Sequence, residues 1–196
     1  MLELVVFLGN PGIKYSRNRH NAGFLLAEKL PFHSTLSWQK KFSGFYTAME
    51  GTEGPVHFIK PETYMNLSGK SVSQAASFFK IKPDVILVVH DDLELPLGTL
   101  SLKFGGGLGG HNGLRSMKAC FGTADFWRLR IGIGRPVNSG MDIVDWVLSN
   151  FDAQETETLE RVLEIGVNLL LAAISNDPKS LLPEWAKKKI PELPDA

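Results

Sequence analysis

The sequence is poor in three features, each of which would point to a particular class of protein. It holds one cysteine, Cys120, in 196 residues, which excludes an internal disulfide framework and fits a reducing compartment. Its 21 basic and 21 acidic side chains cancel, so global charge does not indicate a nucleic-acid partner. No apolar run approaches the roughly 18 residues that a membrane-spanning helix needs. We therefore expect a cytoplasmic protein with no membrane partner, and the helix-like stretch around Cys120 predicts a core position for this thiol.

Several catalytic motifs are also missing. There is no G-x-S-x-G nucleophile elbow, which makes an activated serine of the α/β-hydrolase type unlikely. There is no H-E-x-x-H and no pair of C-x-x-C motifs, so no strong metal-ligand spacing occurs, although His90-Asp91-Asp92 could bind a cation in principle. We expect no metal, and catalytic groups must come from histidines, carboxylates and amides.

The most distinctive stretch that is present runs from Lys103 to Gly113 and holds six glycines among residues 105–113. Such a backbone allows close approach of a phosphate or ribose. Gly105, Gly107 and Gly110 satisfy the G-x-G-x-x-G spacing, but they lie in the middle of the chain and the nearest following acid, Asp125, comes too early for a dinucleotide fold. A nucleotide-dependent enzyme is thus kept only as an alternative.

Charge is distributed unevenly around this glycine-rich stretch. Between Thr99 and Arg135 there are six basic residues and one acid, Asp125. A locally positive segment favours an anionic ligand. An RNA-binding module without catalytic activity is the second alternative that the sequence leaves open.

Hydrophobic patterning predicts strands that alternate with helices. The expected strands are 2–8, 42–50, 56–60, 85–90, 99–104 and 128–134, and the expected helices are 21–30, 69–80, 112–121 and 153–175. Asn21, Ser68 and Asn112 are the expected N-caps of the first three helices, and the last has capping-box spacing at Asp152 and Glu155. This order predicts one α/β domain over residues 1–196, a three-layer α/β/α architecture with a central twisted mixed sheet. The proline-rich segment 177–196 is expected to be a loosely packed tail.

Polar side chains gather where the predicted strands end. Asn10, Asn66, Asp91 and Asn112 each follow a strand, and ligand sites of open α/β sheets form beyond the carboxyl ends of strands. His20, at the mouth of the first helix, is the best candidate for a general base. A histidine, a carboxylate that orients it and several amide donors suit attack of water on an activated acyl ester.

Five ordered motifs resemble those of bacterial peptidyl-tRNA hydrolases, from about Leu4 to the helix ending near Ser175. They are Phe7-Leu8-Gly9-Asn10-Pro11-Gly12-Ile13-Lys14-Tyr15, Arg19-His20-Asn21-Ala22-Gly23, Lys60-Pro61-Glu62-Thr63-Tyr64-Met65-Asn66-Leu67-Ser68-Gly69, His90-Asp91-Asp92-Leu93, and Gly105 to Gly113. The resemblance implies a monomeric enzyme, without cofactor or obligate protein partner, that cleaves the ester between a peptide and the 3'-terminal ribose of tRNA and so recycles tRNA for translation.

The same resemblance implies roles for individual residues. His20 matches the catalytic histidine, Asp91 its acidic partner, and Asn10, Asn66 and Asn112 the asparagines that position substrate and water. The expected substrate-binding residues are Tyr15, Tyr64, Met65, Asn66, His111 and Asn112. Lys103 and Arg130 match basic positions that hold tRNA phosphate, in agreement with the positive segment. The sequence departs from the family pattern at Ser101, where many relatives have a second base, and at Leu108, where a histidine is common.

Overall fold

The computed structural model describes residues 1–136 and 140–191. Its strands form a single eight-stranded mixed sheet with the order β2-β3-β4-β1-β5-β7-β6-β8. The strands are β1 Leu4–Phe7, β2 Gln39–Lys41, β3 Gly44–Gly51, β4 Gly54–Pro61, β5 Ile86–Asp92, β6 Thr99–Phe104, β7 Trp127–Gly132 and β8 Lys188–Lys189. The helices are α1 Ala22–Glu28, α2 Ser68–Phe79, α3 Asn112–Phe121, α4 Ile143–Val147, α5 Ala153–Ser175 and α6 Pro178–Trp185. Short 3-10 turns are η1 Ile13–Tyr15, η2 Arg19–Asn21, η3 Met65–Leu67 and η4 Pro83–Val85.

The centre of the sheet is parallel. Strands β4, β1, β5 and β7 run in the same direction, and β3, β6 and their outer neighbours pair antiparallel. The chain leaves β1 for β4 on one side and later returns to β5 on the other, so β1 lies between them with Val6 opposite both Ile59 and Val88. The order of connections reverses at β1, and the carboxyl ends of these three strands meet at one edge, where sites in open α/β sheets form.

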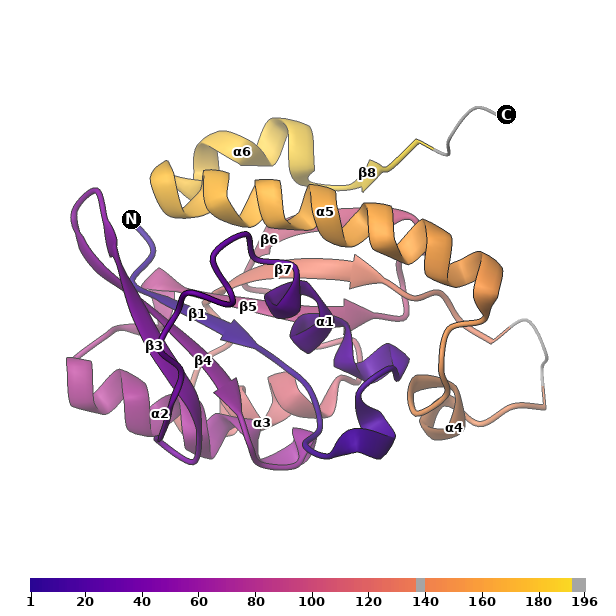
Figure 1. Cartoon of the computed structure of the whole chain (residues 1–196), viewed down its shortest axis with the longest axis horizontal. Helices are drawn as coiled ribbons and strands as arrows, with labels where there is room; N and C mark the ends of the chain where they lie inside the picture. The colour runs from indigo at the N-terminus through magenta and orange to yellow at the C-terminus, as the bar shows by residue number, and fades with distance from the viewer. Residues whose placement is uncertain (137–139, 192–196) are drawn as a thin grey trace.

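Helices cover both faces of the sheet, as Figure 1 shows, with α5 and α6 on one side and α2 and α3 on the other. Alternate residues of β1 enter different cores because strand side chains point to opposite faces. Val5 and Phe7 pack in the core with α1 and α5, whereas Leu4 and Val6 pack with α2 and α3. The predicted three-layer α/β/α class is confirmed.

The predicted elements are present, with ends that shift by a few residues, and α5 begins and ends as predicted. The capping box is also confirmed, because Asp152 accepts from the backbone of Glu155 while the Glu155 side chain accepts from the backbone of Asp152. Asn21 occupies the N-cap position of α1 as predicted, but its side chain makes no capping hydrogen bond. The assignment of Ser68 as a cap was wrong, because α2 begins at Ser68 and its hydroxyl donates to Met65 O at 2.9 Å.

Two further expectations need correction. Residues 178–190 of the expected loose tail form α6 and β8; β8 pairs antiparallel with β6, and Ile190 is buried. Residues 192–196 of that segment lie outside the described residues. Cys120 is exposed instead of buried, because it lies on the outer face of α3. Within the described ranges, none of the helices combines the length and the apolar content required to cross a bilayer.

Candidate active site

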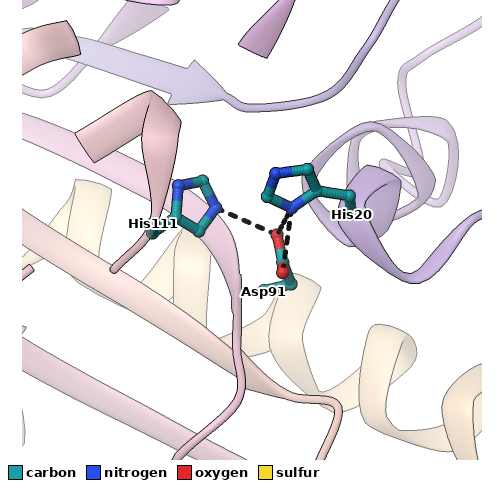
Figure 2. A group of neighbouring side chains, drawn as sticks. All are labelled: His20, Asp91 and His111. Carbon is teal, nitrogen blue, oxygen red and sulfur yellow. Dashed lines mark hydrogen bonds and ion pairs between the residues drawn. The ribbon is translucent and has the colours of Figure 1, made fainter. Parts of the chain in front are cut away.

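Asp91 lies at the centre of the site, near the carboxyl end of β5 and 2% exposed. Its Oδ1 atom is 2.9 Å from Nδ1 of His20 and 3.0 Å from Nε2 of His111, and its Oδ2 atom is 3.0 Å from the same nitrogen of His20. Figure 2 shows the two rings converging on the carboxylate from different segments. Burial would raise the pKa of Asp91, but Coulombic interactions and hydrogen bonds with the two histidines hold it well below its usual range.

His20 lies in the turn η2, between β1 and α1, and is buried. Because the Asp91 carboxylate can only accept, Nδ1 of His20 carries a hydrogen and the neutral ring has its lone pair on Nε2. In Figure 2 the second ring nitrogen points away from Asp91. Burial lowers the pKa of His20, but the charge of Asp91 and its hydrogen bond outweigh this effect, so the net shift is upward. The ring is therefore an oriented and strengthened base.

His111 has a different and fully determined role. It is the N-cap of α3, and its Nδ1 accepts hydrogen bonds from the backbone N–H groups of Gly113 at 3.1 Å and Leu114 at 3.4 Å. Its hydrogen is consequently on Nε2, which donates to Asp91. The prediction that Asn112 caps this helix was wrong. The N-cap is His111, and histidine is an uncommon residue at that position, so the sequence did not suggest it. His111 instead fixes both the helix start and the carboxylate.

Asn10 is held on both its backbone and its side chain. The amide of Asn21 donates to Asn10 O at 3.0 Å and accepts from Asn10 N at 2.9 Å, which explains why the side chain at the N-cap of α1 makes no capping hydrogen bond. The side-chain Oδ1 of Asn10 accepts from Met65 N at 2.8 Å. This bond fixes the amide rotamer, and Nδ2 of Asn10 has no hydrogen-bond partner within the described part of the chain.

Two cavities open at this edge of the sheet. One, of about 220 Å³, is lined by His20, Asp91 and His111, by the glycine-rich loop including Leu108, and by α4 residues such as Val144. The other, of about 310 Å³, is lined by Asn10 and Asn21 among others. They share no lining residue, but the consecutive residues His20 and Asn21 each face one of them.

Met65 of η3 packs closely against Gly113 of α3. Met65 is 4% exposed, and a Cβ atom on Gly113 would lie 2.7 Å from its sulfur and 2.8 Å from Leu8 Cδ1. Any larger residue at this position would therefore require the buried side chains of Met65 and Leu8 to move. The last glycine of the sequence motif has a packing role, and the other glycines of the loop remain exposed or at positive φ.

The remaining predicted substrate-binding residues lie around the openings. Asn112 lines the cavity that contains His20, and both Asn112 and Asn66 are exposed. Tyr64 is 59% exposed, and Tyr15 is half-buried with Lys14 Nζ 4.6 Å from its ring centroid. The asparagines therefore differ in their surroundings, since Asn10 alone of the three is buried.

The two predicted phosphate-binding residues are placed on β6 and β7. Lys103 is exposed and lies against Gly106. Arg130 makes two hydrogen bonds within the protein: Nε donates to Asp92 Oδ2 at 2.8 Å, and Nη1 donates to Ser101 Oγ at 3.2 Å. Its Nη2 has no partner in the described ranges. Arg128, which sequence reasoning did not single out, donates to the carbonyls of Gly107 and Gly106 at 2.6 and 2.9 Å. These two hydrogen bonds hold the backbone of the glycine-rich loop against β7.

His90 is a buried neighbour of Asp91, and it lines neither of the two cavities described above. Its Nδ1 donates to the carbonyl of Asp91 at 2.6 Å, and its Nε2 has no hydrogen-bond partner among residues 1–136 and 140–191. Burial, with a further contribution from His111, lowers the pKa of His90 to about 3. The ring is thus neutral at physiological pH and supports the backbone of Asp91 from inside the sheet.

The side chains of His20, Asp91 and His111 are also of the types that ligate metal ions. Ligand atoms of His20, Asp91 and His111 lie within 4.8 Å of one another, the one such group found in the described residues. However, the nitrogens nearest to the carboxylate are already joined to it by hydrogen bonds, and Nδ1 of His111 is occupied by backbone N–H groups. A metal at this point would have to replace the hydrogens of both N–H groups. The geometry fits a hydrogen-bonded triad better.

Fold and site together define a class: an α/β protein with an Asp-oriented histidine base at the switch point of a mixed sheet. Comparisons with known proteins narrow the class. The family model described as peptidyl-tRNA hydrolase matches residues 4–192. The chain is 47% identical to a peptidyl-tRNA hydrolase of Treponema pallidum (strain Nichols), over 98% of both chains, and 46% identical to one of Desulfitobacterium hafniense (strain Y51), over 85% of this chain and 89% of the relative.

The solved structures agree with these relatives. The crystal structure of peptidyl-tRNA hydrolase from Acinetobacter baumannii superposes with a TM-score of 0.82 and 34% sequence identity, covering 93% of this chain and 91% of that one. The chain belongs to the peptidyl-tRNA hydrolase family, a family of hydrolytic enzymes.

Proposed function

We propose that this protein hydrolyses the ester between a peptide, or an N-blocked aminoacyl group, and the 3'-terminal ribose of tRNA, with His20 as the general base. The observation that carries the proposal is the 2.9 Å contact between His20 Nδ1 and Asp91, which leaves Nε2 free to take a proton from water. Family membership supports the choice of substrate. The geometry supports the roles of His20 as the base and Asp91 as the group that orients it.

The reaction needs no covalent intermediate with the enzyme. Nε2 of His20 accepts a proton as the water oxygen attacks the ester carbonyl, and Asp91 stabilises the imidazolium that forms. The tetrahedral intermediate then expels the ribose oxygen, which takes the proton from Nε2 of the His20 imidazolium as it leaves, so the base returns to its neutral form. Asp91 remains ionised throughout because its pKa is held low, and this electrostatic support is available at every pH at which the base works.

Asn10 is assigned as the donor to the developing oxyanion. Its Oδ1 is fixed by Met65 N, so the amide cannot flip without losing a buried hydrogen bond, and Asn10 lines the cavity of about 310 Å³. A pre-oriented neutral donor stabilises developing charge without reorganising. Asn112, exposed on the wall of the cavity with His20, is placed to hold the attacking water or the ribose.

Recognition of the tRNA is assigned to the exposed ammonium of Lys103 and the remaining N–H groups of Arg130. Asp92 and Ser101 hold the guanidinium of Arg130 at one angle, so it would meet a phosphate as a pre-oriented donor. Tyr15, Tyr64 and Met65, near the cavity that contains Asn10, are assigned to the peptide side of the substrate.

The proposal includes a metal-independent, cofactor-free and monomeric enzyme working in the cytoplasm. The hydrogen-bonded arrangement of His20, Asp91 and His111 supports the first point. The free and exposed thiol of Cys120 fits a reducing compartment. Light scattering of the purified protein tests the oligomeric state directly.

The decisive experiment follows release of an N-acetylaminoacyl group from tRNA in the presence of a chelator. Wild type is compared with His20→Ala, and unacetylated aminoacyl-tRNA is the control substrate. We expect cleavage of the acetylated substrate alone and loss of cleavage in the variant. A folded wild type that binds the tRNA without turnover would overturn the proposal in favour of an RNA-binding module.

A further inference from the structure

The short strand β8 brings a basic segment of the chain to the edge of the sheet. Residues 187–189 are consecutive lysines that follow α6 (Figure 1). Strand β8 pairs antiparallel with β6, with Lys189 opposite Thr99 and Lys188 opposite Leu100. Continuing this register by one residue places Lys187 opposite Ser101. The pairing therefore brings Lys187 beside β6, the strand that carries one of the two predicted phosphate-binding residues.

The hydroxyl of Ser101 links this segment to Arg130. Ser101 is buried, and its Oγ donates to Ala186 O at 2.5 Å. The same oxygen accepts from Nη1 of Arg130 at 3.2 Å, and Ser101 lies opposite Arg130 in the pairing of β6 with β7. Because Lys187 directly follows Ala186, two hydrogen bonds through one hydroxyl join the backbone beside Lys187 to the guanidinium.

The alternation of side chains along β6 shows on which face this link lies. Neighbouring residues of a strand point to opposite faces, and directly opposed residues of an antiparallel pair share a face. Leu100 and Leu102 pack in the core with α5. Ser101 and Lys103 therefore lie on the other face. Lys187, opposite Ser101 in the continued register, lies on that face as well.

Three basic side chains are thus placed on one face of β8, β6 and β7: Lys187, Lys103 and Arg130. Lys187 and Lys103 are exposed, and neither has a hydrogen-bond or ion-pair partner within residues 1–136 and 140–191. Asp92 is an acid of the same region, and its charge is paired with Arg130. This row of cations suits a ligand with several negative charges, such as successive phosphates along a nucleic-acid strand.

We propose that Lys187 is a further tRNA-binding residue, which holds the phosphate next to the one assigned to Lys103 and Arg130. The inference rests on the proposed function, since the tRNA supplies the phosphates. Lys187 lies outside the five motifs that carry the family resemblance, and only the pairing of β8 with β6 brings it to this face. Ser101 is a positioning residue here, because its hydroxyl couples the Arg130 guanidinium to the segment that carries Lys187.

The test measures the Kd for deacylated tRNA as a function of salt concentration, which separates binding from turnover. Loss of one phosphate contact lowers the slope of log Kd against log salt concentration by about 0.7 to 0.9. For Lys187→Met we expect weaker binding at low salt, and a ratio of variant to wild-type Kd that falls about threefold for a fourfold rise in salt. Lys187→Arg should keep the wild-type slope. On N-acetylaminoacyl-tRNA the KM of Lys187→Met should rise while kcat stays unchanged, because the contact is the same in the ground state and the transition state.

Lys188→Met is the matched control, because it removes the same charge from the next residue. Lys188 pairs with Glu184, and its Nζ atom lies 4.3 Å from the ring centroid of Trp185 on α6. Its salt slope should stay close to that of wild type. Equal slope changes in the two variants, or no change in Lys187→Met, would overturn the role of Lys187 while leaving the hydrolase intact.

The proposed function fails separately from this inference. A folded wild type that binds tRNA without turnover would overturn the hydrolase, and the Kd comparison would still decide on Lys187. Absence of tRNA binding by folded wild type would overturn both. Thermal unfolding of each variant excludes misfolding as the cause of weaker binding.

Discussion

The guanidinium of Arg19 donates to both carboxylate oxygens of Glu155, at 2.9 and 2.6 Å, across 136 residues of sequence. The same guanidinium lies 3.6 Å from the ring centroid of Trp146, and the backbone N–H of Arg19 donates to Ser149 O at 3.0 Å. Because Arg19 directly precedes His20, this contact joins the turn that carries the base to the segment between α4 and α5. The position of His20 thus depends on residues far away in the chain.

Replacing Arg19 with methionine should cost about 3 kcal/mol of unfolding free energy, because the change leaves the Glu155 carboxylate partly buried without its partner. The Arg19 side chain is 4% exposed and that of Glu155 23%. Lys29→Met is the control, since Lys29 and Glu160 also join α1 to α5 but are 38% and 45% exposed. That change should cost less than about 1 kcal/mol. Equal losses in urea unfolding would show that the Arg19 pair is no more than a surface contact.

The pH dependence of hydrolysis should reveal the two opposing effects on the pKa of His20, burial and the Asp91 carboxylate. The base works in its neutral form, so kcat/KM rises with pH through the pKa of His20, which lies above its ordinary value of 6.5. Asp91→Asn removes the interactions that raise this pKa and leaves burial, which lowers it. The rising limb should therefore move to lower pH, while the plateau rate falls because the imidazolium loses its support. A limb that keeps its position in the variant would remove Asp91 from the mechanism.

Two substitutions of His111 separate its two contacts. Asparagine can still cap a helix but does not reach Asp91, whereas alanine loses both functions. We expect similar losses of kcat in His111→Asn and His111→Ala, because each leaves Asp91 with fewer donors. Unfolding free energy should fall by about 1 kcal/mol more in the alanine variant. If kcat fell in His111→Ala alone, the cap and not the carboxylate contact would matter for catalysis.

Exchange of a single amide atom tests the role of Asn10. In Asn10→Asp the carboxylate still accepts from Met65 N, but it cannot donate to an oxyanion. We expect kcat to fall by about 10² to 10³. Asn21→Asp is the comparison, because it loses the donor to Asn10 O and should be the less stable variant. Near-normal turnover by a folded Asn10→Asp enzyme would move the oxyanion assignment to another residue.

The sequence predicts those parts of the molecule that local interactions determine. Helix α5 follows from its apolar period and from the capping box of Asp152 and Glu155, which lies within four residues. The meeting of His20 and Asp91 follows from strand ends in a parallel sheet. In contrast, β2 and β8 are short edge strands, and β8 consists of Lys188 and Lys189 alone, so their pairing depends on neighbours and leaves no local pattern.

The contacts that sequence reasoning missed are those made by unusual residue types. Histidine is an uncommon N-cap, so nothing in the local pattern assigned the start of α3 to His111. Arg130 has the charge expected of a phosphate-binding residue, but its pairing with Asp92 depends on β5 and β7 being neighbours. The exposed side of Cys120 follows from the rotation of α3 against the sheet, which composition does not reveal.

His90 should make stability depend on pH in a measurable way. Its pKa is lowered to about 3 in the folded protein and is ordinary in the unfolded chain, so the unfolded state binds the proton first as pH falls. The stabilisation due to neutral His90 is complete above about pH 6.5 and is lost as pH falls towards 3, by up to about 1.4 kcal/mol per pH unit. His90→Asn keeps a donor near the position of Nδ1 and removes the titration of this side chain, so the unfolding free energy of the variant should fall less steeply over this pH range.

Asp91 also contributes stability that is lost on acidification, but both proteins contain Asp91, so its contribution cancels in the comparison. His33→Asn, at a half-buried position whose pKa is also lowered by burial, should keep a slope close to that of wild type. Parallel slopes for wild type and His90→Asn in urea titrations between pH 4 and pH 7 would show that the folded protein accommodates a protonated His90.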